Sequence, residues 1–195
     1  NDSWREQQII FSFARDGHPQ KKFNIGNIET LGDIKKDELL EFYNNEYSAN
    51  RMSLAVLSNH SLDDIEKWSR KYFYMVPNHD LENIVYDHNV FERKKIFRLV
   101  KIEPIKDIRD LEINFALPGT RKYYRSKPGR VLGYITGNEG KGSILSFLKK
   151  KGYATTLTTN IYQATNTYGF FSLRIGLTPE GLENYRNIIK TILSY

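Results

Sequence analysis

The 195-residue sequence contains no cysteine, which excludes disulfide scaffolds, cysteine nucleophiles and cysteine-based metal clusters. Histidine is scarce, with four residues in all, and no two are four apart, the spacing that places two imidazoles on one helical face. No apolar run approaches the ~18 residues that cross a bilayer, and no signal-peptide pattern opens the chain. We therefore expect a cytoplasmic protein with no membrane partner.

The histidines fall in segments that we predict to be loops: His18, His60, His79 and His88. A solvated loop histidine is the expected state of each one. The sequence has no H-E-x-x-H or H-x-x-E-H motif and no G-x-S-x-G nucleophile elbow. We predict neither a catalytic residue nor a metal ligand within this chain.

A glycine-rich segment at 137–143 superficially suggests a phosphate-binding loop. The Walker spacing needs a glycine five residues before the Gly140-Lys141 pair, and that position holds Ile135. The segment before it also reads as helix rather than strand. Two interpretations remain: a junction between two short helices, or a turn whose main-chain groups and Glu139 bind a peptide.

The composition indicates a folded protein with a basic net charge. The formal net charge is +6, and 39% of residues are hydrophobic, enough for a core. Basic and acidic residues alternate closely, as on a solvated surface, although a basic excess favours anionic partners. An RNA-binding module through Lys149, Lys150 and Lys151 remains an alternative, but no nucleic-acid fingerprint accompanies them.

The hydrophobic pattern predicts a mixture of helices and strands. Helices are expected at 1–15, 35–48 and 143–151, and from Ser61, Ser126 and Thr178 onward. Strands are expected at 51–58, 96–102, 111–116, 153–162 and 168–177, with a linker at 77–92. The order strand, Ser or Thr cap and helix occurs at 51–75 and again at 168–195. This order predicts an α+β fold in which antiparallel sheets carry helices on one face. The two halves of the chain would be incomplete copies of the same α+β plan.

The segment 153–168 combines β-branched and aromatic residues with short polar side chains and few charges. An exposed strand of this composition could pair with an extended peptide by main-chain hydrogen bonds. An ordinary interior strand is the alternative on pattern alone.

Several longer stretches then resemble one known family. They are FNIGN (23–27), ELLEFYNNEYSANRMSLAVL (38–57), KIEPIKDIRDLEINFALP (101–118), YYRSKPGRVLGYITGNEGKGSILSFLKKKGYATTL (123–157) and LTPEGLENYRNII (177–189). Together they resemble the insulin-degrading-enzyme type of zinc metalloendopeptidase, the inverzincin or pitrilysin family. The resemblance runs over essentially the whole chain.

The resemblance implies four homologous α+β domains enclosing a chamber. Residues 1–85 would be the C-terminal half of the first, catalytic-type domain, and 86–195 the N-terminal half of the second. Zinc would be held in the full-length enzyme by an H-x-x-E-H helix and a glutamate upstream of Asn1, with none bound here. We expect an internal fragment that is inactive alone, has the remaining domains of the parent chain as partners, and could form a homo-oligomer through exposed interfaces.

The resemblance also implies substrate-binding residues. Gly137 and Glu139 resemble an exosite that grips the N-terminus of a peptide substrate, and Leu157 resembles a position that contacts the same end. Trp4 resembles an aromatic residue near the cleavage site that helps to form a side-chain pocket. The family's paired glycines are replaced near Thr159-Asn160, so peptide preference would differ. A non-catalytic scaffold or processing partner of the same superfamily is the alternative function.

Overall fold

The computed structural model describes residues 1–87, 89–92, 97–162 and 165–195. Two compact units divide the chain: residues 1–23 together with 86–195, named here the sheet unit, and residues 24–85, named the helical unit. The sheet unit contains all of the described strands and both of the regions that carry predicted substrate-binding residues. Each unit is described by itself below.

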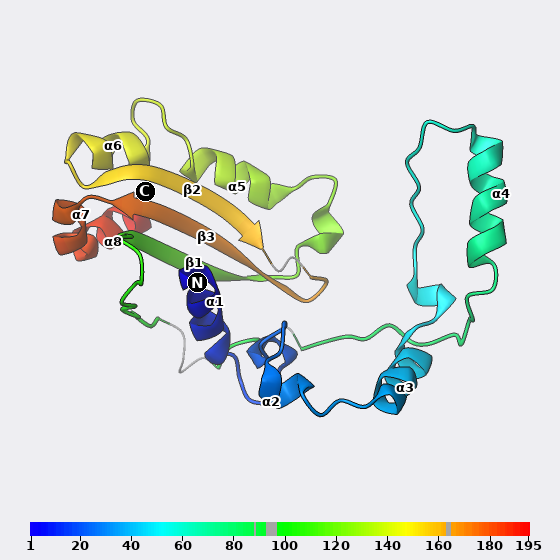
Figure 1. Ribbon diagram of the computed structural model, residues 1–195. Coiled ribbons are helices and arrows are strands. Elements are labelled where there is room, and N and C mark those ends of the chain that lie inside the picture. Colours follow the sequence, from blue (N-terminus) through cyan, green and yellow to red (C-terminus); the bar gives the residue numbers. More distant parts are fainter. Residues whose placement is uncertain (88, 93–96, 163–164) are drawn as a thin grey trace. The chain divides into compact units, whose positions relative to one another are not determined.

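The sheet unit is built on a three-stranded antiparallel sheet with the order β1-β3-β2 (Figure 1). Its strands are β1 (Asp110–Pro118), β2 (Ala154–Tyr162) and β3 (Tyr168–Leu177). Its helices are α1 (Asp2–Ser12), α5 (Pro128–Thr136), α6 (Ile144–Lys150), α7 (Pro179–Glu183) and α8 (Tyr185–Ser194), with 3-10 turns at Pro19–Lys21 and Arg121–Tyr123.

One face of the sheet carries the main core. Register pairs Leu157 and Leu111 with Ile175 on β3, so these side chains point to the same face. Leucine and isoleucine side chains of α6 and α8 pack onto that face. The buried core consists of Ile144, Leu145, Leu148, Ala154, Leu157, Phe171, Leu173, Ile175, Leu177, Ile188 and Ile192.

The opposite face of the sheet is polar along much of its length. Arg174 lies in register with Glu112 on β1 and Thr158 on β2, one residue out of phase with the core positions. Helix α1 contacts this face, and the chain after α1 continues into a second buried cluster with Phe170 and Tyr168. The predicted α+β class with an antiparallel sheet is therefore confirmed.

The local signals at several helix starts behave as predicted. The hydroxyl of Ser143 accepts a hydrogen bond from the Ser146 N–H at 3.1 Å, and that of Thr178 accepts one from the Gly181 N–H at 2.9 Å. Ser61 caps the helix that follows it in the same way. These hydroxyls satisfy main-chain donors that have no partner within the helix. The predicted C-terminal helix is interrupted at Asn184, between α7 and α8.

The helical unit contains α2 (Ile28–Leu31), α3 (Lys36–Glu46) and α4 (Leu62–Phe73), with a 3-10 turn at Ala49–Arg51. The apolar stripe along α4, of a kind that a surface helix normally buries, is largely exposed, with Leu62 at 83% and Tyr72 at 65%. The described residues 24–85 include no sheet against which that face could pack. This expectation of burial is wrong for the unit as it stands.

Two predicted strands are absent from the described residues. Residues 52–57 and 97–102 have no ladder partner and are not strands. Both segments have strand-like composition, but a strand is stable only when its main-chain groups pair with a neighbour. Ile96 lies outside the described residues. The repeat predicted at 51–75 therefore keeps its cap and helix and lacks its strand.

Candidate functional site

The predicted peptide-binding turn lies where the end of α5 approaches β2 (Figure 1). The hydroxyl of Thr159 on β2 donates to the carbonyl of Gly133 at 3.0 Å. Gly137 caps the C-terminus of α5, and a Cβ there would lie 2.7 Å from the Gly133 oxygen and 3.0 Å from the Thr159 hydroxyl. Because neither contact leaves space for a side chain, glycine at 137 permits the close approach of helix and strand.

A hollow of about 430 Å³ lies between α5 and the C-terminal half of β2. Its lining comes from the helix, the strand and one core ring: Gly129, Arg130, Gly133, Tyr134, Thr159, Asn160, Ile161 and Phe171. The hollow is larger than a single amino-acid side chain and is partly open to solvent.

Glu139 lies two residues after Gly137, the C-cap of α5, and is exposed. Its carboxylate lies 3.9 Å from the ammonium of Lys149 on α6, and the two side chains are 67% and 49% exposed. An ion pair this open is weak because water and salt screen it. The carboxylate can therefore exchange Lys149 for another ammonium group at little cost.

Leu157 is almost fully buried, at 4% exposure, within the main core. Its side chain cannot line a peptide-binding surface from that position. Strand β2 is nevertheless an edge strand, pairing only with β3 among the described residues. A contact at Leu157 would therefore be made by its main chain, as an edge strand allows.

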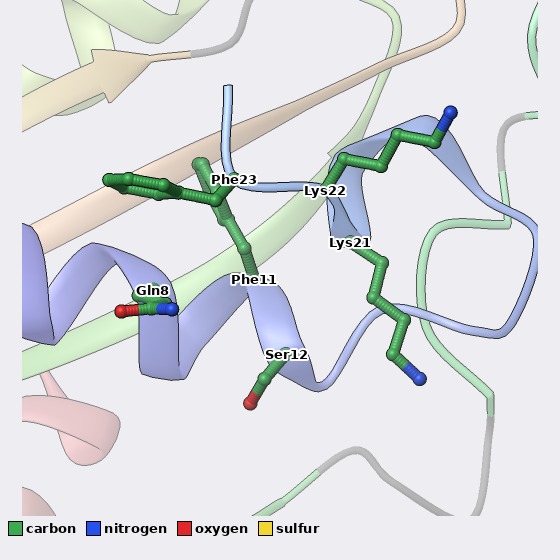
Figure 2. Close-up of a pocket in the computed structure, with 6 residues that line it drawn as sticks. All are labelled: Gln8, Phe11, Ser12, Lys21, Lys22 and Phe23. Atoms are coloured by element: carbon green, nitrogen blue, oxygen red, sulfur yellow. The ribbon is translucent and has the colours of Figure 1, made fainter. Parts of the chain in front are cut away.

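Trp4 lies on α1, and its ring meets that of Phe23 edge-on at a centroid distance of 6.2 Å. Phe23 also lines a hollow of about 160 Å³, together with Gln8, Phe11, Ser12, Lys21 and Lys22. Trp4 is not among the lining residues and reaches the hollow only through its contact with Phe23. Figure 2 shows the side chains of Phe11 and Phe23 at this hollow, with the ammonium groups of Lys21 and Lys22 directed away from the two rings. The hollow thus offers apolar walls to a small side chain.

A charged cluster on the polar face of the sheet was not predicted from the sequence. Arg174 Nη2 donates to both carboxylate oxygens of Glu6 at 2.7 Å, Nη1 donates to Asp110 at 3.0 Å, and the same guanidinium contacts Glu112. Tyr162 completes the group by donating its hydroxyl proton to Asn114 at 2.8 Å. Glu6 and Arg174 are 168 positions apart, so no local pattern could have paired them.

Burial, and next a hydrogen bond with Glu6, raise the pKa of the Glu112 carboxyl to about 7, although the charge of Arg174 lowers it. Burial also raises the pKa of Tyr162 well above its ordinary value, with the charges of Glu112 and Glu6 acting in the same direction. Three carboxylates share one guanidinium here. A proton held by Glu112 relieves the excess negative charge.

The described residues contain no group of three histidine, aspartate or glutamate side chains placed to hold a metal ion. The prediction of a solvated loop is wrong for His18, which is 5% exposed. Its Nδ1 accepts from the Gln20 N–H at 3.1 Å and its ring meets Tyr168 edge-on, so it starts a 3-10 turn inside the fold. His88 lies outside the described residues.

Comparison with known proteins places this geometry in a family. A model described as the peptidase M16 inactive domain matches residues 33–195. The chain belongs to the M16 peptidase family. The predicted resemblance to insulin-degrading enzyme and pitrilysin is thereby confirmed.

Individual M16 relatives match over the whole chain. The A-factor-processing enzyme of Saccharomyces cerevisiae and the insulin-degrading enzyme of Homo sapiens are each 38% identical over 202 residues, covering 100% of this chain and 20% of the relative. The crystal structure of pitrilysin superposes with a TM-score of 0.85 at 26% identity, covering 100% of this chain and 21% of that one. This M16 chain spans about a fifth of the length of the relatives it matches.

No helix in the described part of this M16 chain is both long and apolar enough to cross a membrane. The family model that matches it describes an inactive domain, and no residue of it was predicted to be catalytic. The described surface carries an edge strand, an exposed carboxylate and two hollows.

Proposed function

We propose that this chain is the substrate-anchoring, non-catalytic part of an M16 zinc metalloendopeptidase, a peptide-bond hydrolase. Zinc and the general base would be supplied by other parts of the complete protein. The histidines and carboxylates described here form no group suited to a metal, and we assign none of them as zinc ligands.

The observation that carries the proposal is the position of an edge strand beside the exposed, weakly paired carboxylate of Glu139. Strand β2 has one partner among the described residues, and Gly137 brings the turn containing Glu139 against it. A peptide that pairs with β2 would satisfy main-chain groups along the edge. Its α-ammonium group would displace Lys149 from Glu139, gaining a charge-assisted hydrogen bond.

The hollow beside Trp4 would accept a side chain from a more distant part of the same peptide. Its walls are the rings of Phe11 and Phe23, with the amide of Gln8 at its margin. Apolar walls of this size favour a small or medium-sized apolar side chain. Peptides are therefore the expected partners.

The decisive experiment replaces Glu139 by Gln in the complete protein and measures binding of matched peptides with a free or an acetylated N-terminus. We expect affinity for the free peptide to fall roughly tenfold, because a charge-assisted contact is lost, and affinity for the acetylated peptide to change little. Glu183→Gln on α7 is the control, since it removes the same charge from an exposed position. An equal loss for both peptides would refute the assignment.

A scaffold or processing partner without hydrolytic activity is a second candidate, and the description of the matched domain as inactive favours it. The two candidates differ in the complete protein rather than in this chain. A complete protein that binds zinc stoichiometrically and cleaves peptides supports the peptidase. One that binds the same peptides with no zinc and no cleavage supports the scaffold.

A further inference from the structure

The charged cluster around Arg174 joins the two parts of the proposed peptide site. Glu6 lies on α1 two residues after Trp4, and it receives both short bonds from one Nη atom of Arg174. Arg174 lies on the central strand directly opposite Thr158 of β2, the residue after Leu157. A single side chain thus connects the helix that carries Trp4 to the strand next to the proposed peptide-binding edge.

The other polar contacts of α1 run to a loop rather than to the sheet. The Asp2 carboxylate accepts from the main-chain N–H groups of Ile105 and Lys106 at 3.0 and 3.1 Å, and Arg5 donates to the Glu103 carbonyl at 3.2 Å. These contacts hold the first turn of α1 against residues that form neither helix nor strand. Among the described residues, Glu6 is therefore the polar side chain by which α1 contacts the sheet, at Arg174 of β3 and at Glu112 of β1.

We propose that Arg174 is a positioning residue that, by binding Glu6, fixes α1 and the hollow beside Trp4 relative to the β2 edge. A peptide held at the edge by its N-terminus then presents a later side chain to the hollow at a set distance. The second part of this inference rests on the proposed function, whereas the placement of α1 by Arg174 does not.

Glu112 makes the contact sensitive to pH. It is faced by Glu6 of α1, Arg174 of β3 and Tyr162 of β2, with Asp110 and Asn114 on its own strand. When protonated, Glu112 donates to Glu6 and leaves the guanidinium to Glu6 and Asp110. When ionised, as the pH rises through about 7, it repels Glu6 and competes with it for Arg174, so α1 is held less firmly.

Hydrogen exchange measured by mass spectrometry in the complete protein tests the placement of α1 without reference to activity. Arg174→Gln is expected to speed exchange in peptides covering residues 5–12 by roughly tenfold or more, because a charge-assisted pair is lost. Arg174→Lys should restore part of the protection, and the exposed Arg186→Met should leave it unchanged. Unaltered exchange in Arg174→Gln would overturn the inference.

The pH profile supplies a readout that a merely structural arginine would not give. After correction for intrinsic exchange rates, protection of residues 5–12 in the wild type should fall between pH 6 and pH 8. In Glu112→Gln, whose neutral amide can donate to Glu6 at every pH, protection should stay constant. If protection of residues 5–12 depended on pH in the same way in both proteins, Glu112 would not be the group that makes the contact sensitive to pH.

Two peptides with the same free N-terminus separate this inference from the proposed function. One is long enough only for the β2 edge, and the other continues to an apolar residue for the hollow. Arg174→Gln should leave the dissociation constant of the short peptide unchanged and raise that of the long one about threefold to tenfold, because the two contacts no longer act together. Failure of the short peptide to bind the wild type contradicts the proposed function. An unchanged dissociation constant of the long peptide in Arg174→Gln contradicts the positioning role.

Discussion

Thr159 donates its hydroxyl proton to the carbonyl of Gly133 and so ties the edge strand to helix α5 at 3.0 Å. The bond is part-buried and uses a carbonyl whose own helix also needs it, since the Gly137 N–H reaches the same oxygen at 2.8 Å. One oxygen atom therefore holds both the end of α5 and its contact with β2. This arrangement sets the distance between the turn containing Glu139 and the strand edge.

Replacing Thr159 by Val removes this bond and should loosen α5. The expected loss in the free energy of unfolding is about 1 kcal/mol, typical of one hydrogen bond, with faster hydrogen exchange in residues 128–137. Thr158→Val is the matched control, because Thr158 is exposed on the opposite face of the same strand. Equal protection of α5 in both variants would show that the bond is dispensable.

Replacing Lys149 by Gln should free the Glu139 carboxylate. Affinity for a peptide with a free N-terminus is then expected to rise up to about fivefold, since exposed ion pairs are worth at most ~1 kcal/mol. Calorimetric titration of the complete protein at low salt measures the change. Lys151→Gln, at the end of the same helix, controls for net charge, and an equal rise there would mean that long-range charge rather than the pair is responsible.

Leu157 should prove to be a core residue whose side chain does not touch peptide. Leu157→Ala is expected to cost about 2–5 kcal/mol in unfolding free energy, as for other buried leucines, whereas Leu157→Met keeps most of the volume and should cost under ~1.5 kcal/mol. Chemical denaturation measures both. If folded Leu157→Met lost peptide affinity at unchanged stability, the side chain would have to take part in binding directly.

Glu112 gives stability a definite pH dependence. Its folded pKa of about 7 lies above the ordinary value of 4.5, so the folded state binds the proton more tightly than the unfolded state does. The resulting stabilisation is complete below pH 4.5 and is lost as the pH rises through 7. Thermal unfolding of wild type and Glu112→Gln from pH 5 to pH 8.5 should show the wild type losing stability relative to the variant, and parallel curves would contradict this.

Much of the sheet unit follows from local sequence. Alternating β-branched and aromatic residues predicted strands at 111–116, 153–162 and 168–177, and the structure has them at Asp110–Pro118, Ala154–Tyr162 and Tyr168–Leu177. Strands β2 and β3 are consecutive and pair as a hairpin, whereas β1 pairs with β3 rather than with β2, its neighbour in sequence, and composition alone does not predict that pairing. The stretch 51–58 has similar composition, but no partner strand lies beside it among the described residues, and composition alone cannot supply one.

The candidate site likewise has a part that was predicted from the sequence and a part that was not. The positions of Gly137, Glu139, Leu157 and Trp4 came from a resemblance in motif, and their roles in binding remain predictions. The structure adds that Glu139 is exposed, whereas the side chain of Leu157 is not. The contact of Glu6 with Arg174 depends on how α1 meets the sheet, and the burial of His18 depends on Tyr168 and Asp87, far along the chain. Long-range packing of this kind leaves no periodic trace in a sequence.

Glycine at 129, 133 and 137 has a consequence for the order of folding. Gly129 and Gly133 lie within α5, where glycine costs up to about 1 kcal/mol relative to alanine, whereas Gly137 follows the helix as its C-cap, so α5 has little tendency to form in isolation. All three face β2, where a Cβ would approach Ile161 or Thr159, and β2 lies later in the chain. We therefore expect the segment 128–136 to become a stable helix only after β2 and β3 have formed the surface against which it packs.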